Sequence, residues 1–335
     1  MRKTNLAVVF ATLISICPIT KAAGQAAANT VPTNLPGATT AISPPENFNP
    51  IEASDEELAT YGFPPRPDAQ AEPNANAAWQ KAMLASKHRI APQLQLTNIF
   101  HGPARAPGAV KNTNTTSSNW SGSVDLTGAS SYSSTSAYYI IAEYVVPVAR
   151  QAYGACTGSW DYSSSWVGMD GWGSGDVLQA GTESDAYCWI FGSSTYYSAW
   201  YEWYPNGSVR ISNFPIAPGD DIFVEVWNTS ATQGYAYMVN YNTDQTVEVG
   251  FTAPSNARFI GNSFEWVVER PSVNGSLATL TNYISDYFSN CYGVTHGSTT
   301  YTPSTSSALQ VWMNDNNGNP ISYPYPLGTY GAVSY

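Results

Sequence analysis

The stretch Trp200-Tyr201-Glu202-Trp203-Tyr204 decides the fold, because its residue types alternate along the chain. Successive side chains of a β-strand point to opposite faces. The first, third and fifth residues therefore share one face, and the second and fourth share the other. One face of this predicted strand is aromatic, and the other carries a carboxylate between two aromatic rings.

A second stretch, Phe264 to Glu269, repeats the pattern with the sequence Phe-Glu-Trp-Val-Val-Glu. Phe264, Trp266 and Val268 form an apolar face suited to a core. Glu265 and Glu269 point the other way with Val267. Both stretches thus predict a sheet with one buried face and one face that holds carboxylates beside aromatic rings.

Runs of aromatic and β-branched residues continue on both sides of these stretches, as in 137–147 (AYYIIAEYVVP) and 221–228 (DIFVEVWN). Turn-forming clusters separate them, such as 205–208 (PNGS) and 217–221 (APGDD). Many short strands without alternating helices predict an all-β protein, an antiparallel β-sandwich, from about residue 112 to 335.

The N-terminus has the layout of a secretory signal peptide over residues 1–22. Arg2 and Lys3 precede an apolar run from Leu6 to Ile16, and small residues follow. The run is too short for a membrane anchor, and the predicted location is outside the cell. A lipoprotein cysteine at Cys17 is the alternative, disfavoured because Ile16 stands where a small residue is expected.

Residues 23–111 predict a propeptide that is partly disordered and partly helical. The part from 23 to 50 is rich in Ala, Pro, Thr and Asn without hydrophobic periodicity, which predicts a disordered linker. The part from 74 to 91 predicts a helix, in which Trp79, Met83 and Leu84 share one face.

Charge is distributed unevenly between the end of the predicted propeptide and the predicted β-sandwich domain. Residues 80–111 hold five basic and no acidic residues, whereas residues 112–335 hold 17 acidic residues, four arginines and no lysine. A solvated basic face is the simpler interpretation. The hypothesis we prefer is that the propeptide docks on the acidic domain, covers its cleft as an intramolecular inhibitor, and is released as carboxylates protonate in acid.

Three cysteines, Cys156, Cys188 and Cys291, remain after the signal peptide. An oxidising compartment favours one disulfide with one cysteine left over, and Cys156 with Cys188 is the pair we expect. The wide spacings and the scarcity of histidine disfavour a metal site, and no cofactor is predicted.

The side chains available for catalysis are few. Residues 112–335 contain one histidine, His296, in a polar turn-like setting, which makes His-based and metal-based hydrolysis poor candidates. Carboxylate chemistry assisted by side-chain amides remains.

Six segments of the chain together resemble one family, the eqolisins or glutamic peptidases. They occur in the family's order and are 119–122 (NWSG), 166–171 (WVGMDG), 177–181 (VLQAG), 200–205 (WYEWYP), 218–220 (PGD) and 264–269 (FEWVVE). The resemblance implies a concanavalin-like jelly-roll sandwich with a cleft on one sheet, and a secreted acid endopeptidase made as a zymogen. It also implies a catalytic pair of Gln179 and Glu265. The positions that it implies for the cleft are Asp170, Trp200, Glu202, Tyr204 and, in support, Trp166.

Other interpretations stay open for these residues. Gln179 could decorate a surface, Trp200 and Tyr204 could pack the sandwich, and Asp170 and Glu202 could form a hydrogen-bonded pair. A carbohydrate-binding module or glycoside hydrolase is the alternative function, since it too shows aromatic residues beside carboxylates. The expected partners are protein or peptide substrates and the chain's own propeptide, with no nucleic acid, no membrane and a monomeric state.

Overall fold

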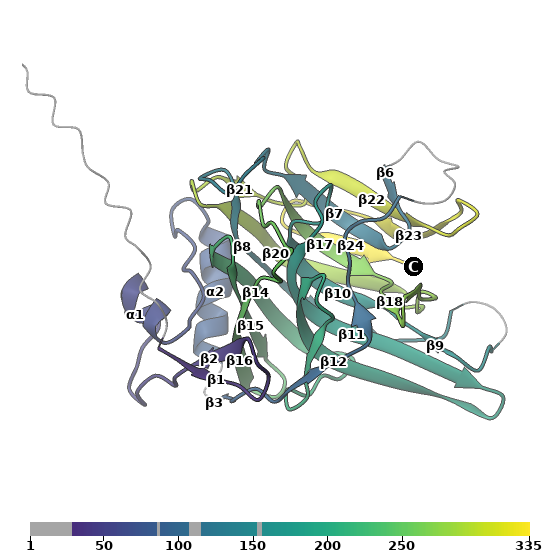
Figure 1. Ribbon diagram of the computed structural model, residues 1–335, viewed down its shortest axis with the longest axis horizontal. Helices are drawn as coiled ribbons and strands as arrows, with labels where there is room; N and C mark the ends of the chain where they lie inside the picture. Colours follow the sequence, from purple (N-terminus) through teal and green to yellow (C-terminus); the bar gives the residue numbers. More distant parts are fainter. Residues whose placement is uncertain (1–28, 86–87, 107–114, 153–155) are drawn as a thin grey trace, which may run out of the picture.

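The computed structural model describes residues 29–85, 88–106, 115–152 and 156–335. Two β-sheets pack face to face, and helices lie only against the outside of one of them (Figure 1). The predicted all-β sandwich is confirmed. The predicted signal peptide and the predicted boundary at residue 111 lie outside the described residues.

The sheet that carries the carboxylate face is called here the front sheet. Its neighbouring strands, in spatial order, are β4 (Leu94–Leu96), β13 (Val209–Ile211), β12 (Gly192–Tyr204), β11 (Val177–Trp189), β10 (Ser164–Met169), β17 (Ser263–Glu269), β7 (Trp120–Leu126) and β22 (Leu309–Asn314). The short strands β9 (Trp160–Asp161) and β6 (Thr115–Ser117) add to β11 and β22.

The back sheet lies behind it. Its order is β1 (Thr30–Pro32), β2 (Ala38–Ala41), β16 (Gln245–Thr252), β15 (Gln233–Asn240), β14 (Asp221–Ser230), β8 (Ala137–Val145), β20 (Ser285–Thr295), β24 (Gly331–Ser334) and β23 (Pro320–Pro324), with β3 (His88–Arg89) on β16 and β21 (Thr300–Tyr301) on β20. Because β23 pairs with both β24 and β22, the hydrogen-bonded ladder continues from one sheet to the other.

The core between the sheets follows the predicted alternation. Tyr201 and Trp203 of β12 and Phe264 and Trp266 of β17 belong to it. Residues of the back sheet complete the core, among them Ile140, Val224, Met238 and Val249. Burying these apolar side chains removes the inner face of each sheet from water, which is the main stabilising contribution to the sandwich.

The region predicted to be a propeptide is more ordered than its composition predicts. Residues 29–50 do not form a disordered linker: β1 and β2 form a hairpin, and β2 pairs with β16 at the edge of the back sheet. Gly37 adopts a φ of +84° in the connection. The strands are short and built of small residues, so they have no hydrophobic periodicity of their own and gain their order by adding to an existing edge.

Two helices follow the hairpin. The predicted helix is α2 (Pro73–Ala85), and it buries Trp79 and Met83. Leu84, however, is 59% exposed, because it lies about 100° around the helix from Met83. The helix α1 (Asp55–Thr60) was not predicted, although Ser54 and Glu57 form a capping box at its start.

The cysteines pair as expected. Cys156 and Cys188 form a disulfide, and Cys291 is a free thiol in the core between the sheets. Within the described ranges, no helix has the length and apolar character needed to cross a membrane.

Candidate active site

Gln179 and Glu265 lie on one face of the front sheet, on either side of a glycine. In the ladder of β10, Gly168 is paired with Gln179 of β11 on one side and with Glu265 of β17 on the other. Residues paired across a sheet project to the same face. The amide and the carboxylate therefore rise from the same face with one strand between them.

Gly168 allows its neighbours to pack closely at this point. A methyl group at this position would lie 2.9 Å from Cβ of Gln179 and 2.8 Å from the Trp166 ring. Any larger residue would thus clash with these two side chains at the floor of the site.

Aromatic rings flank this floor. Trp166 and Trp200 belong to an apolar cluster on the outer face of the front sheet, and both are buried. Trp120 contacts Trp166 edge to face with ring centroids 5.0 Å apart. Trp200 donates from Nε1 to Oγ of Ser164 at 2.9 Å, which fixes its ring orientation.

Residues 99–105, within the predicted propeptide, lie across this face and are called here the cleft segment. At its start, β5 (Ile99–Phe100) pairs with β18 (Ser272–Val273), which in turn pairs with β19 (Ser276–Leu277). Further along, the Ala104 amide donates to the Gly171 carbonyl at 3.1 Å.

The middle of the cleft segment is held by the front sheet. The carbonyl oxygen of Gly102 accepts from Trp120 Nε1 at 3.1 Å and from Asn119 Nδ2 at 3.3 Å. Gly102 also lies against the Tyr204 ring. The segment is therefore positioned by side chains of β7 and β12 as well as by backbone pairing.

His101 places its backbone at Gln179. Nε2 of Gln179 donates to the carbonyl oxygen of His101 at 2.5 Å. The His101 amide donates to Oε2 of Glu202 at 2.9 Å. A peptide carbonyl thus occupies the position at which the Gln179 amide can donate.

Glu265 is fully buried. Both of its carboxylate oxygens lack a hydrogen-bond donor within the described part of the chain. Burial raises the pKa of Glu265 well above its usual range. The neighbouring Ser263 hydroxyl acts to lower this pKa, and the charge of Asp170 raises it further. The Ser263 hydroxyl itself donates to Asn262 at 2.9 Å.

Further carboxylates surround the pair. Burial raises the pKa of Glu202 to about 7, although its hydrogen bonds with His101 act in the other direction. Burial likewise raises the pKa of Glu269, whose Oε1 accepts from Asn119 Nδ2 at 3.1 Å. This face therefore gathers carboxyl groups that hold protons more tightly than exposed ones.

The other residues implied by the resemblance fall into two groups. The first group contacts or surrounds the cleft segment and comprises Trp166, Trp200, Glu202 and Tyr204. Asp170 instead accepts from the backbone amides of Ile260 (2.9 Å) and Asn262 (2.6 Å), and its φ is +68°. It therefore braces the loop before β17, and burial raises its pKa to about 7. Asp170 and Glu202 bond to different partners and do not form the pair considered from sequence.

Sequence reasoning missed three contributors to this face. Glu183 follows Gln179 and Gly181 at strand spacing, so alternation along β11 could have identified it. Trp120 lies in a recognised motif, but its role as a donor to the cleft segment was not foreseen. The sequence around His101 does not indicate its role, because that role depends on where residues 99–105 lie against the front sheet.

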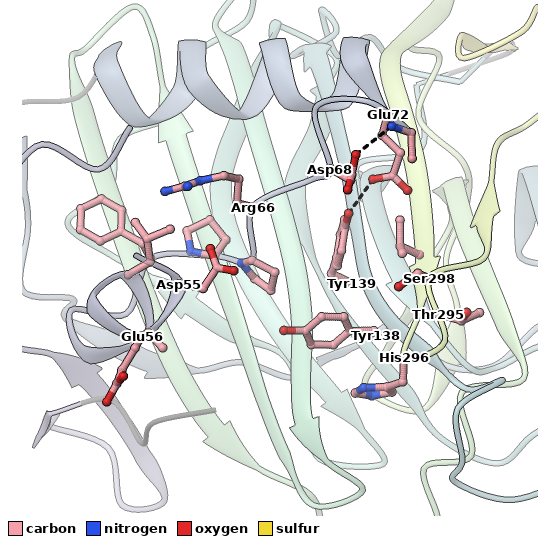
Figure 2. Close-up of a pocket in the computed structure, with 17 residues that line it drawn as sticks. Asp55, Glu56, Arg66, Asp68, Glu72, Tyr138, Tyr139, Thr295, His296 and Ser298 are labelled. Atoms are coloured by element: carbon pink, nitrogen blue, oxygen red, sulfur yellow. Dashed lines mark hydrogen bonds between the residues drawn. The ribbon is translucent and has the colours of Figure 1, made fainter. Parts of the chain in front are cut away.

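A separate cavity of about 490 Å³ lies between the predicted propeptide and the back sheet (Figure 2). Two of its polar residues are engaged: Glu72 accepts from the hydroxyls of Tyr139 (2.8 Å) and Thr300, and His296 bonds to Tyr132 and Asn228. These hydrogen bonds give His296 a structural role, in keeping with its dismissal as a catalytic candidate from sequence.

Comparison with known proteins gives consistent similarities. The model of the peptidase A4 family matches residues 118–323. Aspergillopepsin-2 of Aspergillus niger is 30% identical over 276 residues, which cover 76% of this chain and 93% of the relative. Scytalidopepsin B of Scytalidium lignicola is 36% identical over 115 residues, 34% of this chain and 42% of the relative.

Solved structures agree with this. A crystal structure of scytalido-glutamic peptidase with a transition state analogue inhibitor matches with a TM-score of 0.54 and 26% identity, over 65% of this chain and 98% of that chain. A structure of SCP-B, described as a member of the eqolisin family, in a complex with the tripeptide Ala-Ile-His matches with a TM-score of 0.51 and 25% identity, over the same shares.

Proposed function

Since this chain belongs to the peptidase A4 family, the eqolisins, and is a hydrolase of the glutamic peptidase type, we propose that Gln179 and Glu265 are the catalytic pair with which it hydrolyses peptide bonds in acid. The observation that carries this proposal is the hydrogen bond from Gln179 Nε2 to a peptide carbonyl, with Glu265 one strand away on the same face. The tripeptide bound to the similar SCP-B structure supports a peptide as the ligand of this face.

The proposed reaction begins with an ionised Glu265, which takes a proton from water as the water oxygen bonds to the carbonyl carbon. The carbonyl electron pair moves onto oxygen, where the Gln179 amide stabilises the negative charge. The protonated Glu265 then gives its proton to the amide nitrogen as the C–N bond breaks. The carbonyl re-forms, and the products are a carboxylic acid and an amine.

The cleft segment is the proposed intramolecular inhibitor. It fills the face on which substrate would lie and leaves Glu265 buried. Because burial raises the pKa of Glu265, the group holds its proton in the precursor and lacks both the charge and the water that the reaction needs. Removing the segment exposes Glu265 to water, lowers its pKa and creates the base.

The remaining proposals concern export, substrate class and oligomeric state. The basic start and apolar run of residues 1–22 support export, and the acidic domain supports protein substrates over nucleic acid. We infer a secreted monomeric enzyme. The carbohydrate-active alternative is disfavoured, because the family model that matches the chain is that of a peptidase.

The decisive variant is Glu265→Gln, which keeps the shape of the side chain and removes the base. We expect turnover of denatured globin in acid, with the aspartic-protease inhibitor pepstatin present, to fall by about 10³-fold or more. The variant should also stay full-length in acid, while the wild type loses its propeptide. The measurement is initial rate against pH, with gel analysis of the chain itself.

Asp244→Asn is the matched control. Asp244 lies in the turn between β15 and β16 with a φ of +54°, a conformation that asparagine also tolerates. Its activity should match the wild type within about twofold. A Glu265→Gln protein that kept activity within tenfold of this control would rule out the proposed pair.

A further inference from the structure

The His101 side chain lies in a pocket of its own beside the catalytic pair. The pocket is formed by Trp200 and Glu202 of β12 and by Glu183 of β11, and the imidazole within it is fully buried. We infer that this pocket selects a histidine side chain on the substrate residue whose carbonyl meets Gln179. The inference rests on the proposed function and adds a substrate class to it.

Ring stacking is the first observation that supports it. The His101 and Trp200 rings have centroids 3.6 Å apart and planes 8° from parallel. A flat side chain is required to lie against the indole in this way. Since Trp200 Nε1 is held by Ser164, the indole is oriented before a ligand binds.

The ring nitrogens supply the second observation. Nδ1 of His101 lies 2.9 Å from Oε2 of Glu202, and Nε2 lies 2.5 Å from Oε1 of Glu183. A phenylalanine ring could stack but would leave both buried carboxyl groups without these partners. Such loss of a hydrogen bond at a buried polar group gives strong discrimination between otherwise similar side chains.

The protons can be assigned from the same contacts. Oε2 of Glu202 already accepts from the His101 backbone amide, which fits an unprotonated oxygen that also accepts from Nδ1–H. Burial raises the pKa of Glu183 to about 8 and lowers that of the His101 imidazole. A protonated Glu183 then donates to the unprotonated Nε2.

Hydrogen-bond type separates histidine from the simple cations as well. An imidazole donates with one nitrogen and accepts with the other, whereas lysine and arginine side chains only donate. A lysine or arginine would pair with Glu183 only after that carboxyl had lost its proton, which histidine does not require. The pocket is therefore matched to histidine by shape, by donor and by acceptor.

The test uses wild-type enzyme obtained by acid processing of the full chain. Its substrates are fluorogenic peptides with the sequence of residues 97–106, Thr-Asn-Ile-Phe-X-Gly-Pro-Ala-Arg-Ala, in which X is histidine, phenylalanine or histidine methylated at Nε2. We expect kcat/KM to be at least tenfold higher for histidine than for either replacement, with cleavage between X and glycine. The methylated peptide is the sharpest probe, because it retains the ring but, when neutral, can neither accept at Nε2 nor donate from Nδ1.

The enzyme side is tested with Glu183→Ala, for which the preference for histidine over phenylalanine should fall to within about twofold. Equal wild-type rates for the three peptides, or no cleavage of the histidine peptide by an enzyme that digests globin, would overturn the inference and leave the proposed function standing. Turnover by Glu265→Gln would instead remove the proposed function. The substrate series decides the matter even if Glu183→Ala fails to fold.

Discussion

The proposed propeptide contacts the outer faces of both sheets, and it does so in two different ways. On the back sheet, α1 and α2 lie against the outer face (Figure 1). They bury a broad apolar cluster that includes Trp79 together with Phe223 and Trp227 of β14. On the front sheet, the extended cleft segment crosses the face, and it is held there by hydrogen bonds from Gln179 and Trp120 and to Glu202.

The two contacts have different proposed roles: the back-sheet contact attaches the propeptide, and the front-sheet contact inhibits the enzyme. The apolar side chains that α2 buries, Trp79 and Met83 among them, contribute favourably to docking, since burial contributes in proportion to apolar area. The cleft segment contributes position, because its hydrogen bonds fix where His101 and Gly102 lie. A propeptide can thus be bound firmly at one sheet while a single strand blocks the other.

The largest expected effect follows from removing the main apolar anchor. Trp79 is fully buried, and its Nε1 donates to the Pro64 carbonyl at 3.3 Å. In a Glu265→Gln background, which prevents self-processing, Trp79→Ala should lower the free energy of unfolding of the propeptide layer by about 3–5 kcal/mol. Urea unfolding with hydrogen exchange of the α2 amides measures this.

Leu84→Ala is the control on the same helix, because Leu84 is largely exposed. Its effect should stay within about 0.5 kcal/mol. Equal small effects of the two substitutions would mean that the back-sheet contact does not anchor the propeptide.

Strand alternation explains which parts of the site could be predicted. Gln179, Glu202 and Glu265 lie on long strands whose inner faces are strongly apolar, so the pattern places their side chains on the outer face. The family resemblance then selects among the polar residues of that face. Strand alternation and the family resemblance both depend on residues of the front-sheet strands themselves.

The propeptide contacts could not be predicted in the same way. The β1–β2 hairpin and His101 take their structure from docking on distant strands, with partners 78 or more residues away. Short strands of small residues and a lone histidine have no periodicity. Their order is a property of the assembled sandwich rather than of the segment.

A smaller effect is expected from a buried carboxylate beneath the helices. Both oxygens of Glu225 are buried without a hydrogen-bond donor in the described ranges, and burial, followed by the charge of Glu72, raises its pKa well above the usual range. A raised carboxyl pKa makes the docked state most stable in acid and less stable as pH rises. This acts against release of the propeptide by acid alone.

Glu225→Gln should remove that pH dependence. In the Glu265→Gln background, the substitution should change stability little at pH 4 and raise it by about 1–2 kcal/mol at pH 8. Glu56→Gln, at an exposed position on α1, should show no such trend. A Glu225→Gln effect that grew toward acid would reverse the sign and contradict the assignment.

The smallest effect concerns the ion pair that the charge asymmetry led us to expect. Lys81 of α2 contacts Glu143 at 2.8 Å and Asp221 at 3.5 Å, but its side chain is 51% exposed. Glu143 also accepts from the Tyr241 hydroxyl at 2.8 Å and from Asn290 Nδ2 at 2.6 Å, so it keeps two donors when the lysine is removed.

Lys81→Met should therefore weaken docking by less than about 1 kcal/mol at low salt, and by less at 0.5 M salt, because an exposed ammonium is screened. The measurement is retention of the propeptide by the Glu265→Gln precursor across pH 3 to 7. If Lys81→Met released the propeptide as fully as Trp79→Ala, charge rather than apolar burial would hold the two parts together. Retention by both the lysine and methionine forms at pH 3 would instead mean that maturation requires cleavage of the cleft segment, since loss of charge alone would not free it.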